Sequence, residues 1–504
     1  MSLLALDIGS SSIKAALLEL DEAAAQDASG VVVGPTSAEP FPGPVTGLPP
    51  GYFEVAPQPI VAACRRVMER VLAESPAGFS PVTAVVSCGQ MGGVILVDRQ
   101  GVARSNYLSW RDQRAVQTVG RTGRAAGSPS FFDQLRQRLT ADDWLNLGRE
   151  LQPGSALTML SWLASHQQLD RSGEVGPLSL GDYVWRQLAG GRHGIARTQA
   201  NGWLNLSTGQ LHRDLFERLE IAALNWPLVI DEHQATGTWS EASQHVRREI
   251  PVYSCVGDHP CALMGTRLEP GELSINVSTG SQVSRLSDLF QPGPYQTRPY
   301  FAGQLLNTIT HLPAGRSLNV LIDFMTEWQR ASGGPPADPW DYVIDQAQRA
   351  SEREASERAA GERDASERDS SEWAAGERDV SEGLGVDLAF FAGPLGECGS
   401  ITGITTENFH VGDLFAAAFE SMAKNYDQMA ARLCPQRDWS RFVLSGGLIQ
   451  RVPLLRHQII QRLSKQPGTS AALDAGTLDC EYRLALSTEE TLTGLGQLYR
   501  KIAG

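Results

Sequence analysis

Cysteines, long apolar runs and leader-like features are scarce in this chain. Only seven cysteines occur among 504 residues and none forms a Cys-x-x-Cys pair, which argues against a disulfide framework and favours a reducing compartment. No stretch approaches 18 uninterrupted apolar residues, so we expect no membrane span. The N-terminal residues show no basic region before their short apolar run, and we expect no signal peptide. The expected location is the cytoplasm.

A net positive charge and the common nucleotide loops are missing as well. The formal net charge is −14, which argues against nucleic acid as a partner because phosphate backbones require basic patches. Neither a G-x-G-x-x-G run after a strand nor a G-x-x-x-x-G-K-[ST] loop occurs, so a dinucleotide fold and a P-loop are not expected. With 504 residues, 42% of them apolar and 20% charged, the chain should form two or more globular domains.

Two turns rich in glycine and hydroxyl groups are the main positive signal. They interrupt apolar runs in LLALDIGSSSIKAALLEL (3–20) and LSINVSTGSQVSRL (273–286). Such a turn lets backbone N–H groups and small hydroxyls approach a phosphate, although a single one is more often a simple hairpin. A matched pair in opposite halves predicts two related lobes that close on ATP. The candidate nucleotide-binding residues are Gly9, Ser10, Ser11, Ser12, Thr279, Gly280 and Ser281.

Two charged residues flank the first turn. Asp7 ends the first apolar run, where a hard carboxylate could hold Mg²⁺ through water; the alternative is an Asx-type turn residue. Lys14 is a candidate phosphate contact, and its alternative is a solvated strand residue. Asp7 and Lys14 therefore complete the predicted Mg²⁺–ATP site.

Asp258 is the candidate general base. It stands in V-G-D-H-P, where an extended segment gives way to small residues. A carboxylate within hydrogen-bond reach of a sugar hydroxyl can accept its proton, which contributes about 10²- to 10⁴-fold in rate. The alternative is a helix N-cap. We interpret the neighbouring His259 as a packed or capping residue.

Sugar recognition requires planar polar groups and an aromatic surface. The segment CGQMGG (88–93) supplies Gln90, and YLSWRDQR (107–114) supplies an aromatic ring with charged groups of both signs. By itself the second segment is more often the start of a surface helix. The candidates in it are Trp110, Arg111, Asp112 and Arg114.

The order of apolar runs predicts an α/β protein. Strand-like runs lie at 3–8, 13–20, 82–87 and 94–97, a helix is expected at 59–74 and a surface loop at 34–57. The region 140–226 is expected to be largely helical. We predict an N-terminal lobe, 1–253, and a C-terminal lobe, 254–504. The latter contains a five-residue repeat at 350–383, which we interpret as a solvated low-complexity insertion because a period of five forms no fixed apolar helix face.

Together these motifs resemble the FGGY carbohydrate kinases, part of the actin, sugar-kinase and heat-shock ATPase superfamily. The resemblance implies two actin-like (ribonuclease H-like) ATPase lobes with an interlobe cleft, ATP and Mg²⁺ as cofactors, and a small-molecule sugar as partner. It implies no membrane partner and allows for a homodimer. Asp258 would be the base, Gln90 and Met91 would bind sugar, and Gly446 and Gly447 in LSGGLIQRVPLLR would approach adenosine. The motifs are LDIGSSSIKA, CGQMGG, SWRDQR, GDHPCALMG, VSTGS and LSGGLIQRVPLLR.

Within the family, the sedoheptulokinase branch is the best match, through segments at 182–190, 202–206, 299–301 and 317–324. This implies phosphorylation of sedoheptulose at its terminal C7 hydroxyl; the alternatives are xylulokinase or another sugar or polyol kinase. The chain departs from the family pattern at Gly92, where a histidine is usual, at G-E-C (396–398) and at EETLTGLGQL (489–498). These departures leave a sugar-binding pseudokinase open. A nucleotide-switched protein like the actin cousins is the remaining alternative.

Overall fold

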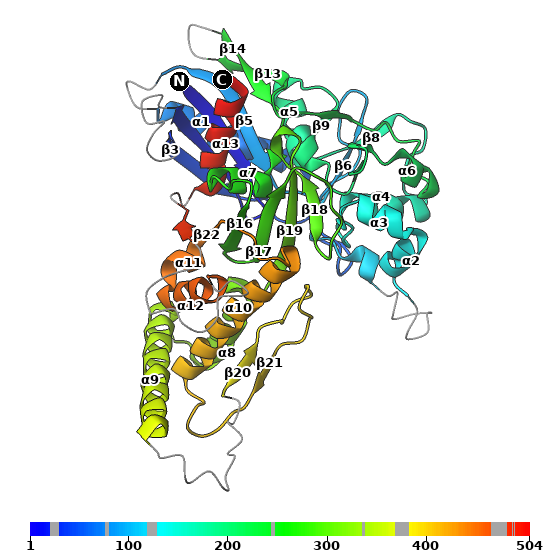
Figure 1. The fold of residues 1–504 in the computed structure, drawn as a ribbon. Coiled ribbons are helices and arrows are strands. Elements are labelled where there is room, and N and C mark those ends of the chain that lie inside the picture. The colour runs from blue at the N-terminus through cyan, green and yellow to red at the C-terminus, as the bar shows by residue number, and fades with distance from the viewer. Residues whose placement is uncertain are drawn as a thin grey trace. The chain divides into compact units, whose positions relative to one another are not determined.

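The computed structural model divides the chain into two compact units (Figure 1). Unit 1 comprises Met1–Pro270, Leu286–Asn307 and Leu486–Gly504, and unit 2 comprises Gly271–Arg285 and Thr308–Ala485. Both units mix strands and helices, as the α/β prediction requires. The structure describes residues 1–20, 30–75, 80–117, 129–242, 247–334, 338–367, 383–464, 481–485, 487 and 489–503.

A mixed sheet carries unit 1, with the strand order β13-β14-β5-β1-β2-β3 and β15 paired to the end of β5. β1 runs antiparallel to β2 and parallel to β5. The apolar runs expected at 3–8, 13–20 and 82–87 are thus strands. The strands are β1 (Ser2–Ile8), β2 (Ser12–Leu20), β3 (Val31–Pro40), β5 (Val82–Gly89), β13 (Ala235–Ala242), β14 (Arg247–Tyr253) and β15 (Val256–Gly257).

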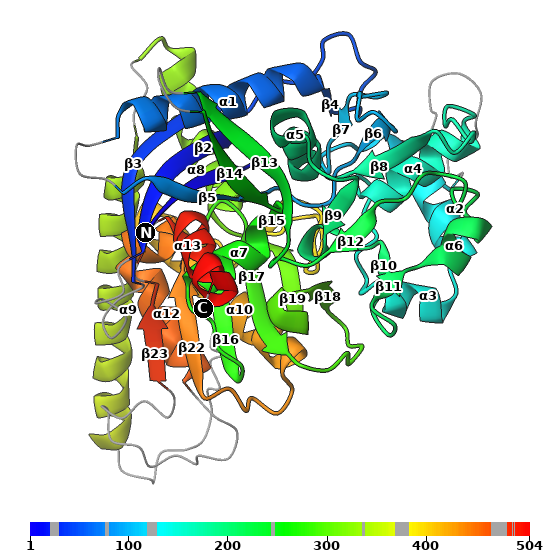
Figure 2. The ribbon, with the colours of Figure 1, turned by 90° about the horizontal axis from the view of Figure 1, so that it is seen from above.

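The two faces of this sheet bury different partners. Because side chains alternate along a strand, Leu4, Leu6 and Ile8 of β1 share one face, where they join a core with the apolar side of α1 (Pro57–Ala73) and with α5 (Leu180–Ala189). Asp7 has the opposite parity and lies on the side of α13 (Glu490–Ala503), which packs on α7 (Asp258–Gly265). Figure 2 shows α1 and α13 on opposite sides of the strands.

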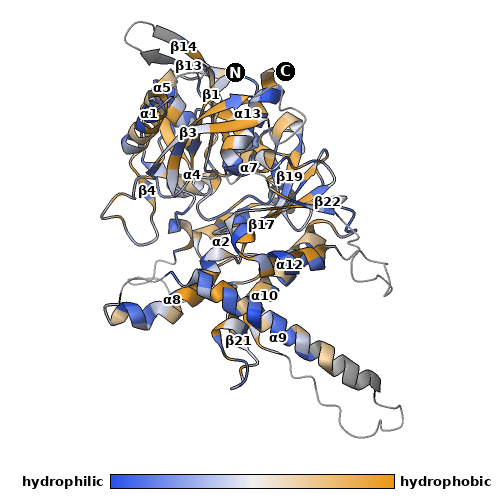
Figure 3. Ribbon diagram, turned by 90° about the vertical axis from the view of Figure 1, so that its left-hand side faces the viewer, coloured by the Kyte–Doolittle hydropathy of each residue, from blue (hydrophilic) through white to orange (hydrophobic). Residues whose placement is uncertain are grey.

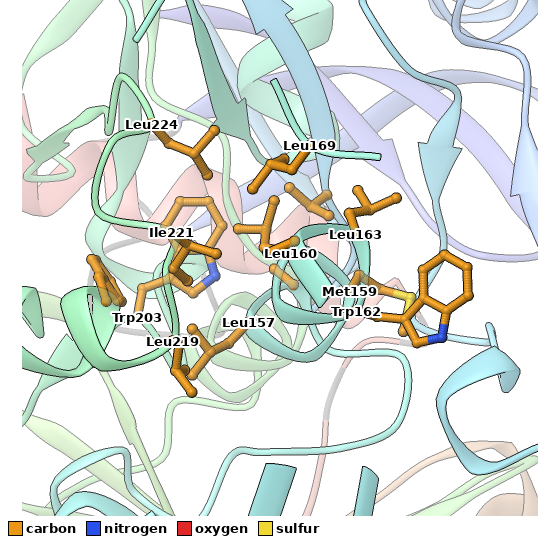
Figure 4. Packing of buried hydrophobic residues seen from close by; sticks show 14 of the residues in the cluster. Leu157, Met159, Leu160, Trp162, Leu163, Leu169, Trp203, Leu219, Ile221 and Leu224 are labelled. Carbon is orange, nitrogen blue, oxygen red and sulfur yellow. The ribbon is translucent and has the colours of Figure 1, made fainter. Parts of the chain in front are cut away.

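A second core in unit 1 is built around α4 (Ala156–Ser165) and several tryptophans (Figure 4). The region 140–226 is less helical than expected, because short strand pairs separate its helices. Two further helices of this region are α3 (Ala141–Asn146) and α6 (Arg213–Arg218), and α2 (Phe131–Arg138) precedes them. The short strands are β4 (Glu54–Val55), β6 (Ile95–Asp98), β7 (Tyr107–Leu108), β8 (Val175–Leu178), β9 (Gly194–Ala196), β10 (Leu204–Asn205), β11 (Gln210–Leu211), β12 (Leu228–Ile230) and β18 (Gln296–Pro299).

Unit 2 repeats the pattern of a sheet with helices, in the strand order β19-β17-β16-β22-β23. β16 is antiparallel to β17 and parallel to β22. The strands are β16 (Glu272–Val277), β17 (Ser281–Ser287), β19 (Leu305–Leu312), β22 (Arg441–Ser445) and β23 (Glu481–Leu484), with a separate pair β20 (Gly385–Asp387) and β21 (Ser400–Thr402). The helices are α8 (Gly315–Ala331), α9 (Trp340–Glu367), α10 (Val411–Leu433), α11 (Gly447–Arg451) and α12 (Pro453–Leu463).

The five-residue repeat, which we interpret as a solvated low-complexity insertion, begins as a helix in the structure. α9 continues into it as far as Glu367, whereas residues 368–382 lie outside the described residues. Ala, Glu and Arg are strong helix formers, so the segment forms a helix without an apolar face. Hydrophilic residues make up much of α9 (Figure 3). Its buried residues Val343 and Ala347 precede the repeat, and Ala350 is the first residue of the repeat.

Two other expectations differ from the structure. The segment expected as a surface loop, 34–57, begins inside β3, an edge strand that tolerates Pro35 and Pro40 because one side of it needs no ladder partner. The compact units also divide later than the predicted boundary after residue 253, since α7 packs against the C-terminal α13 inside unit 1. The roles assigned to the two predicted lobes, and the cleft between them, stay predictions.

Candidate active site

Three parallel strand ends meet at one edge of the sheet in unit 1. β5 lies between β1 and β15, so that Asp7 and Val256 both pair with Cys88 from opposite sides. In open α/β sheets, ligands bind beyond the carboxyl ends of such strands. The residues that follow the three ends are Gly9, Gln90 and Asp258. The structure therefore brings the first turn, a predicted sugar residue and the predicted base to one edge.

Asp7 has one satisfied and one free carboxylate oxygen. Thr491 Oγ1 of α13 donates a hydrogen bond to Asp7 Oδ2 at 2.7 Å, whereas Oδ1 is buried without a partner. Burial raises the pKa of Asp7, and the hydrogen bond from Thr491 opposes this. A buried carboxylate oxygen without a hydrogen-bond donor is suited to a hard cation, because the cation would stabilise its negative charge.

No preformed metal cage accompanies Asp7. Across the described part of the chain, no group of three or more His, Cys, Asp or Glu side chains could hold a metal ion. Mg²⁺ commonly binds through one or two carboxylates together with water and substrate phosphates. A single carboxylate such as Asp7 is compatible with this mode of binding, and Mg²⁺ binding through Asp7 stays a prediction.

Lys14 faces an acidic partner from the other end of the chain. Its Nζ lies 2.5 Å from Glu489 Oε2, and both side chains are partly exposed. A phosphate would compete with Glu489 for the ammonium group, so a role of Lys14 in nucleotide binding stays a prediction. Glu489 and Thr491 belong to the segment in which the sequence departs from the family pattern.

The turn after β1 is held open by neighbouring polar side chains. Arg111 Nη2 donates to the carbonyl oxygen of Ser10 at 3.1 Å, and Gln90 Nε2 lies 3.5 Å from that of Gly9. A Cβ atom on Gly9 would come within 3.0 Å of the Ser12 carbonyl oxygen, so only glycine permits this turn without a shift. The side chain of Ser11 is exposed and free to meet a ligand.

Asp258 is the first residue of α7, directly after Gly257. Burial, reinforced by the charge of Asp7, raises the pKa of Asp258 to about 7. The backbone N–H of His259 donates to Asp258 Oδ1 at 2.8 Å and, together with the charge of Arg298, works in the opposite direction. A carboxylate with a pKa near neutrality is suited to accept and release protons.

An ion pair that the sequence did not predict lies beside Asp258. Arg298 Nε is 2.5 Å from Glu150 Oε1, and the two side chains are only 11% and 3% exposed. Arg298 Nη1 lies 3.0 Å from His259 Nδ1. Because arginine has no acceptor, His259 must accept here in its neutral form, and burial lowers the pKa of His259 well below its usual value. Three distant segments supply these groups, so no local motif marks them.

The predicted sugar residue Gln90 is linked to Trp110. Trp110 Nε1 donates to Gln90 Oε1 at 3.1 Å, and Trp110 remains 37% exposed. Met91 lies against Gly257, where a Cβ atom would approach its Sδ to 2.7 Å. Gly92 has φ +91°, a conformation that a histidine would adopt only with strain. The missing family histidine thus coincides with a turn that favours glycine.

Asp112 and Arg114 form a buried pair of their own. Arg114 Nε and Nη2 donate to Asp112 Oδ1 and Oδ2 at 2.9 and 2.7 Å, and the backbone N–H of Phe53 donates to Oδ2 at 2.8 Å. The Arg114 guanidinium also stacks 3.9 Å from the ring centroid of Tyr52. With 0% and 5% exposure, both residues support the loop that carries Trp110, and direct sugar binding by them stays a prediction.

Tyr107 is a further polar group that sequence reasoning missed. It is fully buried and its hydroxyl has no hydrogen-bond partner. Burial raises the pKa of Tyr107, and the charge of Asp258 adds to this effect. A Cβ atom on Gly93 would lie 2.2 Å from the hydroxyl, so glycine makes room for it. An orphan hydroxyl near the candidate base can accept or donate to a substrate hydroxyl.

In unit 2 the structure brings the second turn beside the double glycine. The turn Ser278–Gly280 connects β16 to β17, and a Cβ atom on Gly446 would approach Val277 O to 2.4 Å and Ser278 Oγ to 2.7 Å. By contrast, a Cβ atom on Gly280 or Gly447 would meet nothing within 4 Å. Gly446 thus serves close packing, and the other two glycines border open space.

The remaining residues of the second turn differ in exposure. Thr279 is exposed, and its carbonyl oxygen accepts from the backbone N–H of Arg316 at the start of α8 at 2.9 Å. Ser281 is buried, with its hydroxyl 2.8 Å from that of Tyr426. Thr279 is free to meet a phosphate, whereas nucleotide binding by the Ser281 side chain stays a prediction that would require Tyr426 to release it.

The family model of the N-terminal domain of FGGY carbohydrate kinases matches residues 2–265, and the chain belongs to this family. The similar solved structures show the fold alone, the actin-like α/β fold that the motifs predict. Xylulose kinase from Rhodospirillum rubrum has a TM-score of 0.71 at 17% identity, covering 100% of this chain and 91% of its own. Plasmodium falciparum glycerol kinase with ADP has a TM-score of 0.72 at 15% identity, covering 99% and 88%.

Among curated proteins, the xylulose kinase of Staphylococcus xylosus is 24% identical over 243 residues, 47% of this chain and 47% of the relative. The glycerol kinase of Gloeobacter violaceus is 25% identical over 290 residues, 56% of this chain and 52% of the relative. The chain spans about half the length of these curated relatives. In the described residues, no helix has the length and apolar character needed to cross a membrane.

Proposed function

We propose that the protein is an ATP-dependent carbohydrate kinase that transfers the γ-phosphate of ATP to a terminal hydroxyl of a ketose. The observation that carries the proposal is Asp258, placed at the start of α7 beside the ends of β1 and β5, with a pKa raised to about 7. A base with this pKa is about half ionised at neutral pH and can accept the proton of an alcohol in the transition state.

In the proposed reaction, the acceptor hydroxyl oxygen bonds to the γ-phosphorus of ATP and the bond to the β–γ bridging oxygen breaks. The hydroxyl proton passes to Asp258, and ADP leaves. Gly9–Ser12 and Thr279–Gly280 are proposed phosphate-binding turns, while Gly446 and Gly447 are proposed to border the adenosine. Mg²⁺, when bound through Asp7, would neutralise charge on the phosphates.

Sedoheptulose is our first candidate for the acceptor, on the sequence segments that resemble the sedoheptulokinase branch. Xylulose fits equally, because xylulose kinases are among the similar curated proteins and solved structures. Gly92 removes an imidazole from the segment that we assign to the sugar, and the exposed Trp110 offers an apolar surface there. Differences in hydroxyl partners of this kind decide which ketose reacts.

The test is an ADP-release assay on the full chain with ATP, Mg²⁺ and a panel of ketoses and polyols that includes sedoheptulose and xylulose. We expect turnover with at least one ketose, and a decrease of about 10²- to 10⁴-fold in kcat for Asp258→Asn. Asp98→Asn serves as the matched control, since Asp98 is the last residue of β6 and pairs with Arg104.

Near-native turnover by Asp258→Asn would refute the role of Asp258 as base. Binding of ATP and sugar by calorimetry without ADP release from any sugar would refute the kinase and favour a sugar-binding pseudokinase.

A further inference from the structure

The ion pair between Glu150 and Arg298 is shielded from solvent, because both side chains are almost completely buried. Burying two charges costs free energy that the pair regains only with good geometry and further hydrogen bonds. Asn201 Nδ2 donates one such bond to Glu150 Oε2 at 3.3 Å, and the third guanidinium nitrogen of Arg298, Nη1, contacts His259 Nδ1. Through Arg298, the ion pair therefore contacts His259, the residue that follows Asp258.

The backbone that carries Glu150 is built to reach Arg298. Gly148 and Arg149 both have positive φ angles, 65° and 56°, which costs about 1 kcal/mol or more for the non-glycine residue. The backbone N–H of Thr297 donates to Gly148 O at 2.9 Å, and a Cβ atom on Gly148 would lie 1.9 Å from Thr297 O. This strained loop thus docks on the backbone of β18, one residue from Arg298.

We propose that Arg298, held by Glu150, is a positioning residue for Asp258: it fixes the first turn of α7 through His259 and supplies the cation that balances the Asp258 carboxylate. This inference rests on the proposed function, in which Asp258 accepts the proton. Neutral His259 transmits position and not charge, so the balancing charge comes from Arg298 itself.

Besides its own backbone N–H, four groups of the described residues act on Asp258 electrostatically. Asp7 on β1 raises its pKa, whereas Arg298 on β18 and the backbone N–H of His259 lower it. The hydroxyl of Tyr107 on β7 also interacts with its charge. Arg298 is the only side-chain cation of the four, and removing it leaves Asp258 between Asp7 and an unpaired Glu150.

The two partners of the pair should therefore act in opposite directions. In Arg298→Met, loss of the cation should raise the pKa of Asp258 by about one unit or more. In Glu150→Gln, Arg298 keeps its charge without an anionic partner, so the pKa of Asp258 should fall. A merely structural role would move the two variants in the same direction. Arg298→Lys keeps the charge and should lie near the wild type.

The pKa can be measured without turnover through the pH dependence of stability. The pKa of Asp258 is raised in the folded protein, so the protonated carboxyl group stabilises the fold. This stabilisation decreases as the pH rises to about 7, and the stability no longer depends on Asp258 titration above that pH. The difference in thermal midpoint between each protein and its Asp258→Asn derivative, followed from pH 5 to 9, locates this break. The same break should appear in kcat/KM of the active proteins. Arg104→Met, which removes an exposed partner of Asp98, is the control.

We expect the break at higher pH in Arg298→Met, at lower pH in Glu150→Gln and unchanged in Arg104→Met. Unchanged breaks in both test variants, or shifts of the same sign, would overturn the inference. If Arg298→Met does not fold, the sign in Glu150→Gln decides. Opposite shifts in a protein that phosphorylates no sugar would support the charge network and refute the proposed function, so the two failures are distinguishable.

Discussion

The candidate residues of unit 1 and unit 2 use different means to meet a ligand. In unit 1, Asp7 and Asp258 are carboxylates whose pKa values burial raises. In unit 2, Gly280 and Gly447 present backbone with open space where a side chain would be. Charge that is held out of water is suited to proton transfer and cation binding, whereas open backbone is suited to contact with phosphate or a base plane. In the proposed function, the buried carboxylates that carry the chemistry therefore belong to unit 1, whereas proposed phosphate-binding turns occur in both units.

The pH dependence of activity tests the unit 1 side of this comparison most strongly. Since the pKa of Asp258 is raised to about 7, kcat/KM should fall about tenfold for each pH unit below 7, or about 100-fold at pH 5. The acid limb should vanish in the residual activity of Asp258→Asn. An acid limb with its midpoint near pH 4 would show that Asp258 titrates as an ordinary carboxylate.

Glycine substitutions test whether the open backbone of unit 2 serves ligand binding or packing. Gly446→Ala introduces a Cβ atom at φ 94° and 2.4 Å from Val277 O, and should lower the free energy of unfolding by about 2 kcal/mol or more. Gly447→Ala is the matched control, because its Cβ atom meets nothing within 4 Å. It should leave stability nearly unchanged while ATP binding weakens in a calorimetric titration. Equal loss of stability in both variants would contradict the distinction between packing and open glycines.

Thr491→Val tests how α13 serves Asp7. The variant removes the hydroxyl that donates to Asp7 Oδ2 and should cost about 1 kcal/mol of stability. Without that donor the pKa of Asp7 should rise further, so the Mg²⁺ concentration for half-maximal activity should increase. Thr493→Val, two residues further along the same helix and hydrogen-bonded to Ser487, controls for general damage to α13. An unchanged Mg²⁺ requirement would argue against Asp7 as the metal ligand.

Tyr107→Phe should have the smallest effect on stability. The hydroxyl is buried without a partner, so its removal should be neutral or should stabilise the protein by up to about 1 kcal/mol in urea unfolding. If the hydroxyl meets the sugar, KM should nevertheless rise several-fold. A loss of stability with an unchanged KM would assign Tyr107 to the core alone.

The sequence was a good guide wherever the signal was local. β1, β2 and α1 follow from short periodic patterns. Asp258 lies at the start of a helix, close to the alternative N-cap position that its V-G-D-H-P context offers. The pairing of Arg298 with Glu150 and of Thr491 with Asp7 could not be predicted, because the partners lie 148 and 484 positions apart. The buried pairing of Asp112 with Arg114 was also missed, since spacing alone does not reveal burial.

The hydrogen bond from α13 to Asp7 implies an order in which the end of β1 acquires its partners. Asp7 precedes its hydrogen-bond donor Thr491 by 484 positions in the chain. Glycine-to-backbone contacts between Gly494 and Cys261 then seat α13 on α7. The carboxylate at the end of β1 therefore lacks this donor until the residues of α13 have been synthesised.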